Sequence, residues 1–174
     1  PDKNNLLTKL KNAGYPVAGV GKIEDIFAGE GITDALHTKS NLDGMRVTHE
    51  YMDKYEKGLI FTNLVEFDST WGHRRDVEGY AKGLEEFDTE LKQLIDKMTQ
   101  EDLLIITADH GCDPTFKGTD HTREYVPGLL YQKGMKDINL HDKLSFACLG
   151  QTVADIFQVE PLAIGESLLP FMMQ

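Results

Sequence analysis

The chain contains 174 residues, of which 27% are charged and 40% hydrophobic, a length and balance that suit one globular domain with a sizeable core. Its formal net charge of −11 argues against nucleic acid as a partner, because phosphate backbones bind basic protein surfaces. No apolar run approaches the roughly 18 residues of a membrane span, no signal peptide is visible, and the two cysteines form no disulfide framework, so we expect a cytoplasmic protein without a membrane partner.

Hydrophobic periodicity predicts alternating helices and strands along the chain. Between 76 and 98 the apolar residues recur mostly at spacings of three and four, which is typical of a long amphipathic helix. The run 59–67 is almost continuously apolar, as in a strand buried on both faces. In chain order we expect a helix over 5–13, a strand over 15–20, helices over 23–28 and 41–57, a strand over 59–67, a helix over 76–98, strands over 103–107 and 127–131, a helix over 149–157 and a short turn at 166–169.

The helix expected over 41–57 has a clear start signal. Ser40 can cap it, with Asp43 three residues later. Its apolar face would consist of Leu42, Met45, Met52 and Tyr55. Because strands alternate with helices throughout, we expect an α/β fold with a mostly parallel sheet flanked by helices.

Acidic residues and histidines follow two of the apolar strands. Asp68 comes directly after the first strand, with His73 in the attached loop. Asp109 and His110 follow the second strand, and His121 lies eleven residues beyond His110. Groups at the carboxyl ends of parallel strands share one edge of the sheet, so these five residues should meet. Carboxylate and imidazole are ligands of catalytic metal ions, which predicts a divalent-metal site, although a hydrogen-bond network could use the same residues.

The same stretches carry a family resemblance. The stretch D-S-T-W-G-H-R-R-D begins at Asp68, A-D-H-G surrounds Asp109, and G-T-D-H-T-R-E-Y-V-P begins at Gly118. In this order they resemble phosphopentomutase, a family of the alkaline phosphatase superfamily. The A-D-H-G stretch alone marks only the superfamily, whereas the combination is specific. The resemblance covers nearly the whole chain, including 19–23 and 25–33.

The resemblance implies that 1–174 is the C-terminal portion of a metal-binding catalytic core with an alkaline-phosphatase-like fold. A phosphopentomutase is longer. It also has an N-terminal core segment, with a further metal-binding Asp and a phosphorylated Thr, and a cap domain. Neither part is matched here, so we expect the missing N-terminal part as a partner and no activity from this portion alone.

The resemblance also divides the five candidate ligands between two divalent ions. Asp68, His73 and His121 would hold one ion. Asp109 and His110 would hold the other, with the Asp of the missing segment. The family usually uses Mn²⁺, although this ligand set also suits Zn²⁺ or Fe²⁺.

Other residues near these stretches have expected roles. Lys22 follows a strand and resembles the family lysine near the phosphorylated Thr, where it could neutralise phosphoryl charge. Arg74 and Arg75 could contact phosphate, but their place at a helix start favours salt bridges to acids. Cys112 stands where the family usually has Asn.

The implied activity is the interconversion of ribose or deoxyribose 1-phosphate and 5-phosphate, a step of nucleoside catabolism. A phosphothreonine enzyme with two metal ions would transfer the phosphoryl group through a sugar bisphosphate, which also serves as activator. Two alternatives remain: another enzyme of the superfamily, such as a cofactor-independent phosphoglycerate mutase or a phosphatase, and a non-catalytic metal-binding module. The stretch from Gly118 argues against the first, and the complete set of five ligands argues against the second.

Overall fold

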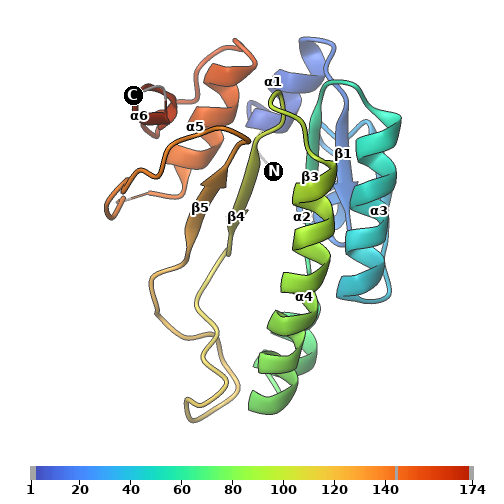
Figure 1. Ribbon diagram of the computed structural model, residues 1–174, viewed down its shortest axis with the longest axis vertical. Helices are drawn as coiled ribbons and strands as arrows, with labels where there is room; N and C mark the ends of the chain where they lie inside the picture. Colours follow the sequence, from blue (N-terminus) through green and yellow to red (C-terminus); the bar gives the residue numbers. More distant parts are fainter. Residues whose placement is uncertain (1–2, 144, 173–174) are drawn as a thin grey trace.

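A computed structural model describes residues 3–143 and 145–172 as an α/β fold (Figure 1). Three parallel strands form one sheet in the order β2-β1-β3, and two antiparallel strands form a second. The strands are β1 (Val17–Val20), β2 (Asp34–Leu36), β3 (Leu59–Thr62), β4 (Leu104–Thr107) and β5 (Gly128–Tyr131). The helices are α1 (Leu6–Asn12), α2 (Ile23–Ile26), α3 (Asn41–Lys54), α4 (Val77–Lys97), α5 (Ala147–Ile156) and α6 (Leu169–Met172).

The two long helices begin where their capping residues predict. The Ser40 hydroxyl accepts a hydrogen bond from the backbone N–H of Asp43 at 3.1 Å, which confirms the expected cap of α3. The Asp76 carboxylate accepts from the N–H of Gly79 at 2.9 Å and caps α4 in the same way. Each cap satisfies a backbone donor that the first helical turn leaves unpaired.

Strand β1 is the centre of the core, because all four of its residues are buried. Val17 packs in a cluster with residues of α1 and α5, including Leu10. Ala18 and Val20 point to the opposite face, where Val47 of α3 covers them. This alternation places α1 and α5 on one face of the sheet and α3 on the other.

Strand β3 is shorter than the expected strand over 59–67. Its last backbone hydrogen bond to β1 is made by the N–H of Asn63. Beyond it, Leu64 packs against the cluster between α3 and α4, and Phe67 makes edge-to-face and tilted contacts with the rings of Trp71 and Tyr80. The apolar run therefore serves helix packing as well as the sheet, which periodicity alone does not distinguish.

The chain differs from the sequence prediction at four further places. Strand β5 runs antiparallel to β4, because the 108–127 connection contains no crossover helix. Strand β2 is too short to give an alternating pattern and was not expected. Helix α6, which was not expected, begins at Leu169, where the expected turn over 166–169 ends. Leu42 was placed on the apolar face of α3, but it is 48% exposed.

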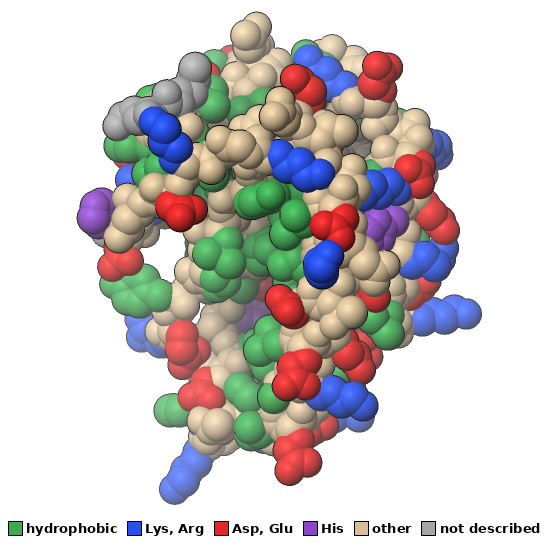
Figure 2. All heavy atoms as spheres, viewed as in Figure 1, with side chains coloured by type: hydrophobic (Ala, Val, Ile, Leu, Met, Phe, Trp, Pro, Cys, Tyr) green, Lys and Arg blue, Asp and Glu red, His purple; other side chains and the backbone are tan. Residues whose placement is uncertain are grey.

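The strands that lead to the candidate ligands are less buried than β1. Both β3 and β4 were expected to be buried, yet most of their residues are only half-buried. Figure 2 shows apolar side chains gathered along the middle of the face that it presents. Across 3–143 and 145–172, no helix has both the length and the apolar character that crossing a bilayer requires.

Thr152 joins α5 to the segment before α6 and provides a test of this packing. It is 0% exposed, and its hydroxyl donates to the carbonyl of Cys148 at 2.7 Å and accepts from the N–H of Leu168 at 2.8 Å. Thr152→Val should lower the free energy of unfolding by about 1–3 kcal/mol, because it leaves the Leu168 N–H buried and unpaired. Urea unfolding measures the loss.

Thr89→Val is the matched control, since the exposed Thr89 hydroxyl also donates to a carbonyl one helical turn back. It should change the free energy of unfolding by no more than about 0.5 kcal/mol. Equal losses in the two variants would contradict a special role for the buried hydroxyl.

Candidate metal centre

A π-helical segment, η1 (Phe67–Gly72), connects β3 to α4 and carries Asp68. Its wide turn is visible in the hydrogen bond from the N–H of His73 to the carbonyl of Asp68, five residues back, at 2.9 Å. π-Helical turns occur often at functional sites, because they re-aim a side chain within an otherwise helical path. Here the turn places the side chains of Asp68 and His73 on the same side of η1, where they contact each other.

Trp71 holds η1 against the start of α4. Its ring lies over two glycines of the helix, and a Cβ at Gly83 would lie within 3.0 Å of it. A Cβ at Gly79 would lie 2.5 Å from the same ring. Phe67 extends the contact, with ring centroids 5.3 Å from Trp71 and 5.2 Å from Tyr80. The position of the Asp68 carboxylate thus depends on two glycines in the N-terminal part of α4.

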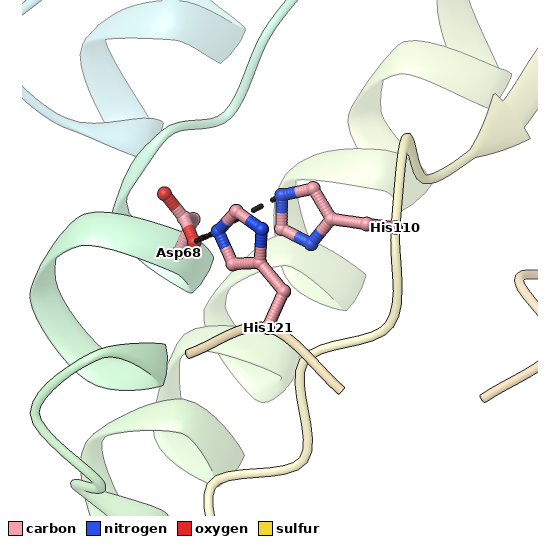
Figure 3. Close-up of side chains that lie close together, drawn as sticks. All are labelled: Asp68, His110 and His121. Carbon is pink, nitrogen blue, oxygen red and sulfur yellow. Dashed lines mark ion pairs between the residues drawn. The ribbon is translucent and has the colours of Figure 1, made fainter. Parts of the chain in front are cut away.

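The imidazole groups of His110 and His121 lie on one side of this carboxylate (Figure 3). Nε2 of His121 lies 3.0 Å from Oδ1 of Asp68, Nε2 of His73 lies 3.2 Å from it, and Nε2 of His110 lies 3.9 Å from it. The Nε2 atoms of His73 and His121 are 3.2 Å apart. Asp68, His110 and His121 each offer a ligand atom within 4.8 Å of the others, so they could hold a metal ion.

The opposite ring nitrogens are engaged by backbone carbonyls. Nδ1 of His73 contacts the carbonyl oxygen of Thr119, and Nδ1 of His110 lies 3.0 Å from the carbonyl oxygen of Gly111. A neutral imidazole that donates from Nδ1 carries its lone pair on Nε2. When His73 and His110 donate from Nδ1, their Nε2 lone pairs point toward Asp68.

This arrangement leaves one carboxylate oxygen without a donor. Oδ1 of Asp68 is buried and accepts no hydrogen bond of normal geometry from the described residues, although two Nε2 atoms are within 3.2 Å. Nitrogen lone pairs and a negative oxygen that converge on one point repel one another unless a proton or a metal ion lies between them. The donor set therefore fits a divalent metal ion, and carbonyl-bound Nδ1 atoms are the usual support of metal-binding histidines.

Asp109 lies at the outer side of this cluster. Its side chain is 77% exposed, and its Oδ1 lies 3.6 Å from Nε2 of His110. The rings of His110 and His121 stack with centroids 3.5 Å apart. The five sequence-predicted residues are thus connected through neighbouring contacts, with His110 between the two acids.

The loop that carries His121 is closed at its base by a bridge between Gly111 and Thr122. The N–H of Thr122 donates to the carbonyl of Gly111 at 3.1 Å, and the Thr122 hydroxyl accepts from the N–H of Asp113 at 2.6 Å. Cys112 lies inside this base and packs against Gly72 of η1. Burial raises the pKa of the Cys112 thiol, and the charge of Asp68 raises it further, so the thiol remains protonated at neutral pH.

Three basic residues near the candidate ligands have different surroundings. Lys22 is exposed at the start of α2, directly after the carboxyl end of β1. Arg74 is exposed as well. Arg75 was expected to pair with acids, but its guanidinium donates to backbone carbonyls of the 113–120 segment. A sequence offers no signal for such contacts, because any residue can supply a carbonyl.

Known proteins resemble this chain over most of its length. A family model described as the metalloenzyme superfamily matches residues 3–161. The phosphopentomutase of Clostridium novyi is 55% identical over 170 residues, which are 97% of this chain and 44% of that protein. That of Caldanaerobacter subterraneus is 56% identical over 165 residues, or 94% and 42%, and that of Alkaliphilus metalliredigens is 50% identical over 175, or 100% and 45%. The chain spans less than half the length of these relatives.

Proposed function

This chain belongs to the metalloenzyme superfamily, and from that premise we propose that it forms part of a phosphopentomutase. The intact protein would interconvert ribose or deoxyribose 1-phosphate and 5-phosphate in the cytoplasm, as a step of nucleoside catabolism. The high identity to proteins named phosphopentomutase supports this assignment. The observation that carries it is the buried Oδ1 of Asp68, which accepts no hydrogen bond from the described residues and lies within 3.2 Å of two imidazole nitrogens.

Membership of this superfamily implies a divalent metal, and we propose two ions, both Mn²⁺. Mixed carboxylate and imidazole ligands suit that metal. Bound ions would supply positive charge that stabilises a phosphoryl group during its transfer. The phosphothreonine and the sugar-selecting residues implied by the resemblance have no match here, so 1–174 would supply ligands and not the nucleophile. A sugar bisphosphate would serve as activator.

We assign Asp68, His73 and His121 to one ion and Asp109 and His110 to the other. The distances support this division, since the Nε2 atoms of His73 and His121 are nearer to Asp68 than that of His110 is. His110 is nearer to Asp109, at 3.6 Å. The second ion would need a further ligand from the rest of the intact protein.

We propose Lys22 as a phosphate contact. Val20 of β1 pairs with Thr62 of β3, so Lys22 leaves the sheet at the same edge from which η1 begins. The turn before it is tight, because a Cβ at Gly21 would lie 2.5 Å from the carbonyl oxygen of Asn63. A lysine at this edge can place its ammonium near a phosphoryl group.

The test is an assay of the intact, Mn²⁺-loaded protein with ribose 1-phosphate, deoxyribose 1-phosphate, 3-phosphoglycerate and a simple phosphate ester. We expect conversion of the pentose phosphates to 5-phosphates, and none by 1–174 alone or after chelation. Conversion of phosphoglycerate, or release of phosphate from the ester, without pentose phosphate turnover would favour another enzyme of the superfamily. No turnover of any substrate, with metal bound, would favour a non-catalytic module.

A further inference from the structure

The side chain of Arg75 reaches from the start of α4 to the loop that carries His121. Its Nη1 donates to the carbonyl of Asp113 at 2.8 Å and its Nη2 to the carbonyl of Asp120 at 2.6 Å. Its Nε donates to the carbonyl of Gly118. All three nitrogens of the guanidinium are thus used on one segment, 113–120.

We propose that Arg75 is a positioning residue for the metal centre. Its guanidinium holds the 113–120 segment in the shape that brings His121 to Asp68. The proposal rests on the proposed function, because it assumes that these side chains bind a metal ion. It assigns Arg75 no contact with metal or substrate.

The other hydrogen bonds within the segment are local, since the N–H of Thr115 donates to the Asp113 carboxylate and the N–H of Phe116 to the Asp113 carbonyl. All of its residues from Thr115 onward are exposed, and so is His121. The bridge between Gly111 and Thr122 closes the base of the loop but does not reach its middle. The middle is held by Arg75 and by Nδ1 of His73, which contacts the carbonyl next to those that Arg75 binds. One short stretch after η1 therefore supplies a ligand and shapes the loop that supplies another.

The contacts require an arginine. A guanidinium presents donors in a fixed, planar fork, whereas a lysine ammonium is a single point on a flexible stem and cannot meet three separated carbonyls. The backbone of Arg75 has φ 56°, in the left-handed region that costs a residue other than glycine about 1 kcal/mol or more. This conformation directs the side chain across to the loop, and glycine can adopt it without strain.

The experiment compares Arg75→Gly, Arg75→Lys and Arg74→Gln in the intact protein. Arg75→Gly removes the guanidinium without backbone strain, Arg75→Lys keeps the charge, and Arg74→Gln removes the exposed neighbouring arginine. Calorimetric titration with Mn²⁺ should show affinity about 10–100-fold weaker in both Arg75 variants and unchanged in Arg74→Gln. In the metal-free protein, amides of 113–121 should exchange faster in the Arg75 variants alone.

Rescue separates positioning from a general loss of structure. Guanidinium ion at non-denaturing concentration should restore part of the Mn²⁺ affinity of Arg75→Gly, while ethylammonium should not. Wild-type affinity together with wild-type exchange in Arg75→Lys would overturn the proposal. If Arg75→Gly does not fold, the Mn²⁺ affinity and amide exchange of Arg75→Lys alone test the proposal.

Asp68→Asn in the same titration separates the two hypotheses. If Mn²⁺ binds Asp68→Asn as it binds the wild type, the proposed metal site fails, and the proposal that rests on it fails with it, whatever the loop exchange shows. If Asp68→Asn loses binding while both Arg75 variants keep it, the metal site stands and only the positioning role is overturned.

Discussion

Replacing Asp68 with asparagine should remove the metal ion that Asp68 binds while leaving the metal-free protein at least as stable as before. The change preserves the shape of the side chain but removes the negative charge that a cation needs. The asparagine amide can also donate to an imidazole lone pair, so the converging acceptors lose a repulsive contact. Mn²⁺ affinity should fall by more than about 100-fold, since changes outside the ligand shell already cost 10–100-fold. Turnover in the intact protein should fall by roughly 10³.

Thermal unfolding with and without Mn²⁺ checks both parts of this expectation. Chain 1–174 should gain about 2.7 kcal/mol when Mn²⁺ is present at 100 times the dissociation constant of the Asp68 site, and Asp68→Asn should gain much less, because only the incomplete second site remains. Asp109→Asn is the matched control, because Asp109 is largely exposed and would belong to the second ion. It should keep one bound ion. Full Mn²⁺ stabilisation of Asp68→Asn would show that the other residues bind the ion without it.

Gly83→Val should be the most damaging change outside the ligands. The added side chain would have to occupy the space of the Trp71 ring, which lies within 3.0 Å of any Cβ at this position. The free energy of unfolding should fall by about 3 kcal/mol through overpacking, although valine is the better helix former of the two. Displacement of Trp71 would move η1 and with it Asp68, so Mn²⁺ affinity should fall about tenfold.

Urea unfolding and Mn²⁺ titration measure these two losses. Ala81→Val adds a branched side chain to an exposed position of the same helix and should cost about 0.5 kcal/mol, with no effect on Mn²⁺ affinity. If Gly83→Val is no more harmful than Ala81→Val, Trp71 can move freely and does not hold η1 in place.

The sequence predicts which acidic and histidine side chains come together better than it predicts the details of the sheet. Asp68 and Asp109 follow apolar runs directly, and this pattern is local, so it survives errors in the lengths of the strands. The alternation of helices and strands is also local, and the α/β fold is confirmed. The direction of β5 depends instead on how the 108–127 loop returns, which no periodicity records.

The contacts that position the candidate ligands are the ones that cannot be predicted from the sequence. Arg75 donates to backbone carbonyls, which every residue possesses, so its partners cannot be recognised from the amino-acid sequence. Gly79 and Gly83 did offer a signal, because glycines inside a helical pattern often mark a close approach. The partner of that approach is Trp71 of η1, which the helical pattern does not identify.

Lys9 of α1 is buried and pairs with Glu160, 151 positions along the chain, at 2.6 Å. In the same region α1 packs against α5 and shares its core cluster. Closing a loop of that length costs about 4 kcal/mol of chain entropy, which local contacts do not offset, and such distant pairings are typical of slow folding. Neighbouring segments alone therefore cannot complete this core. The face of β1 that Val17 presents stays partly open until the far segment returns to cover it.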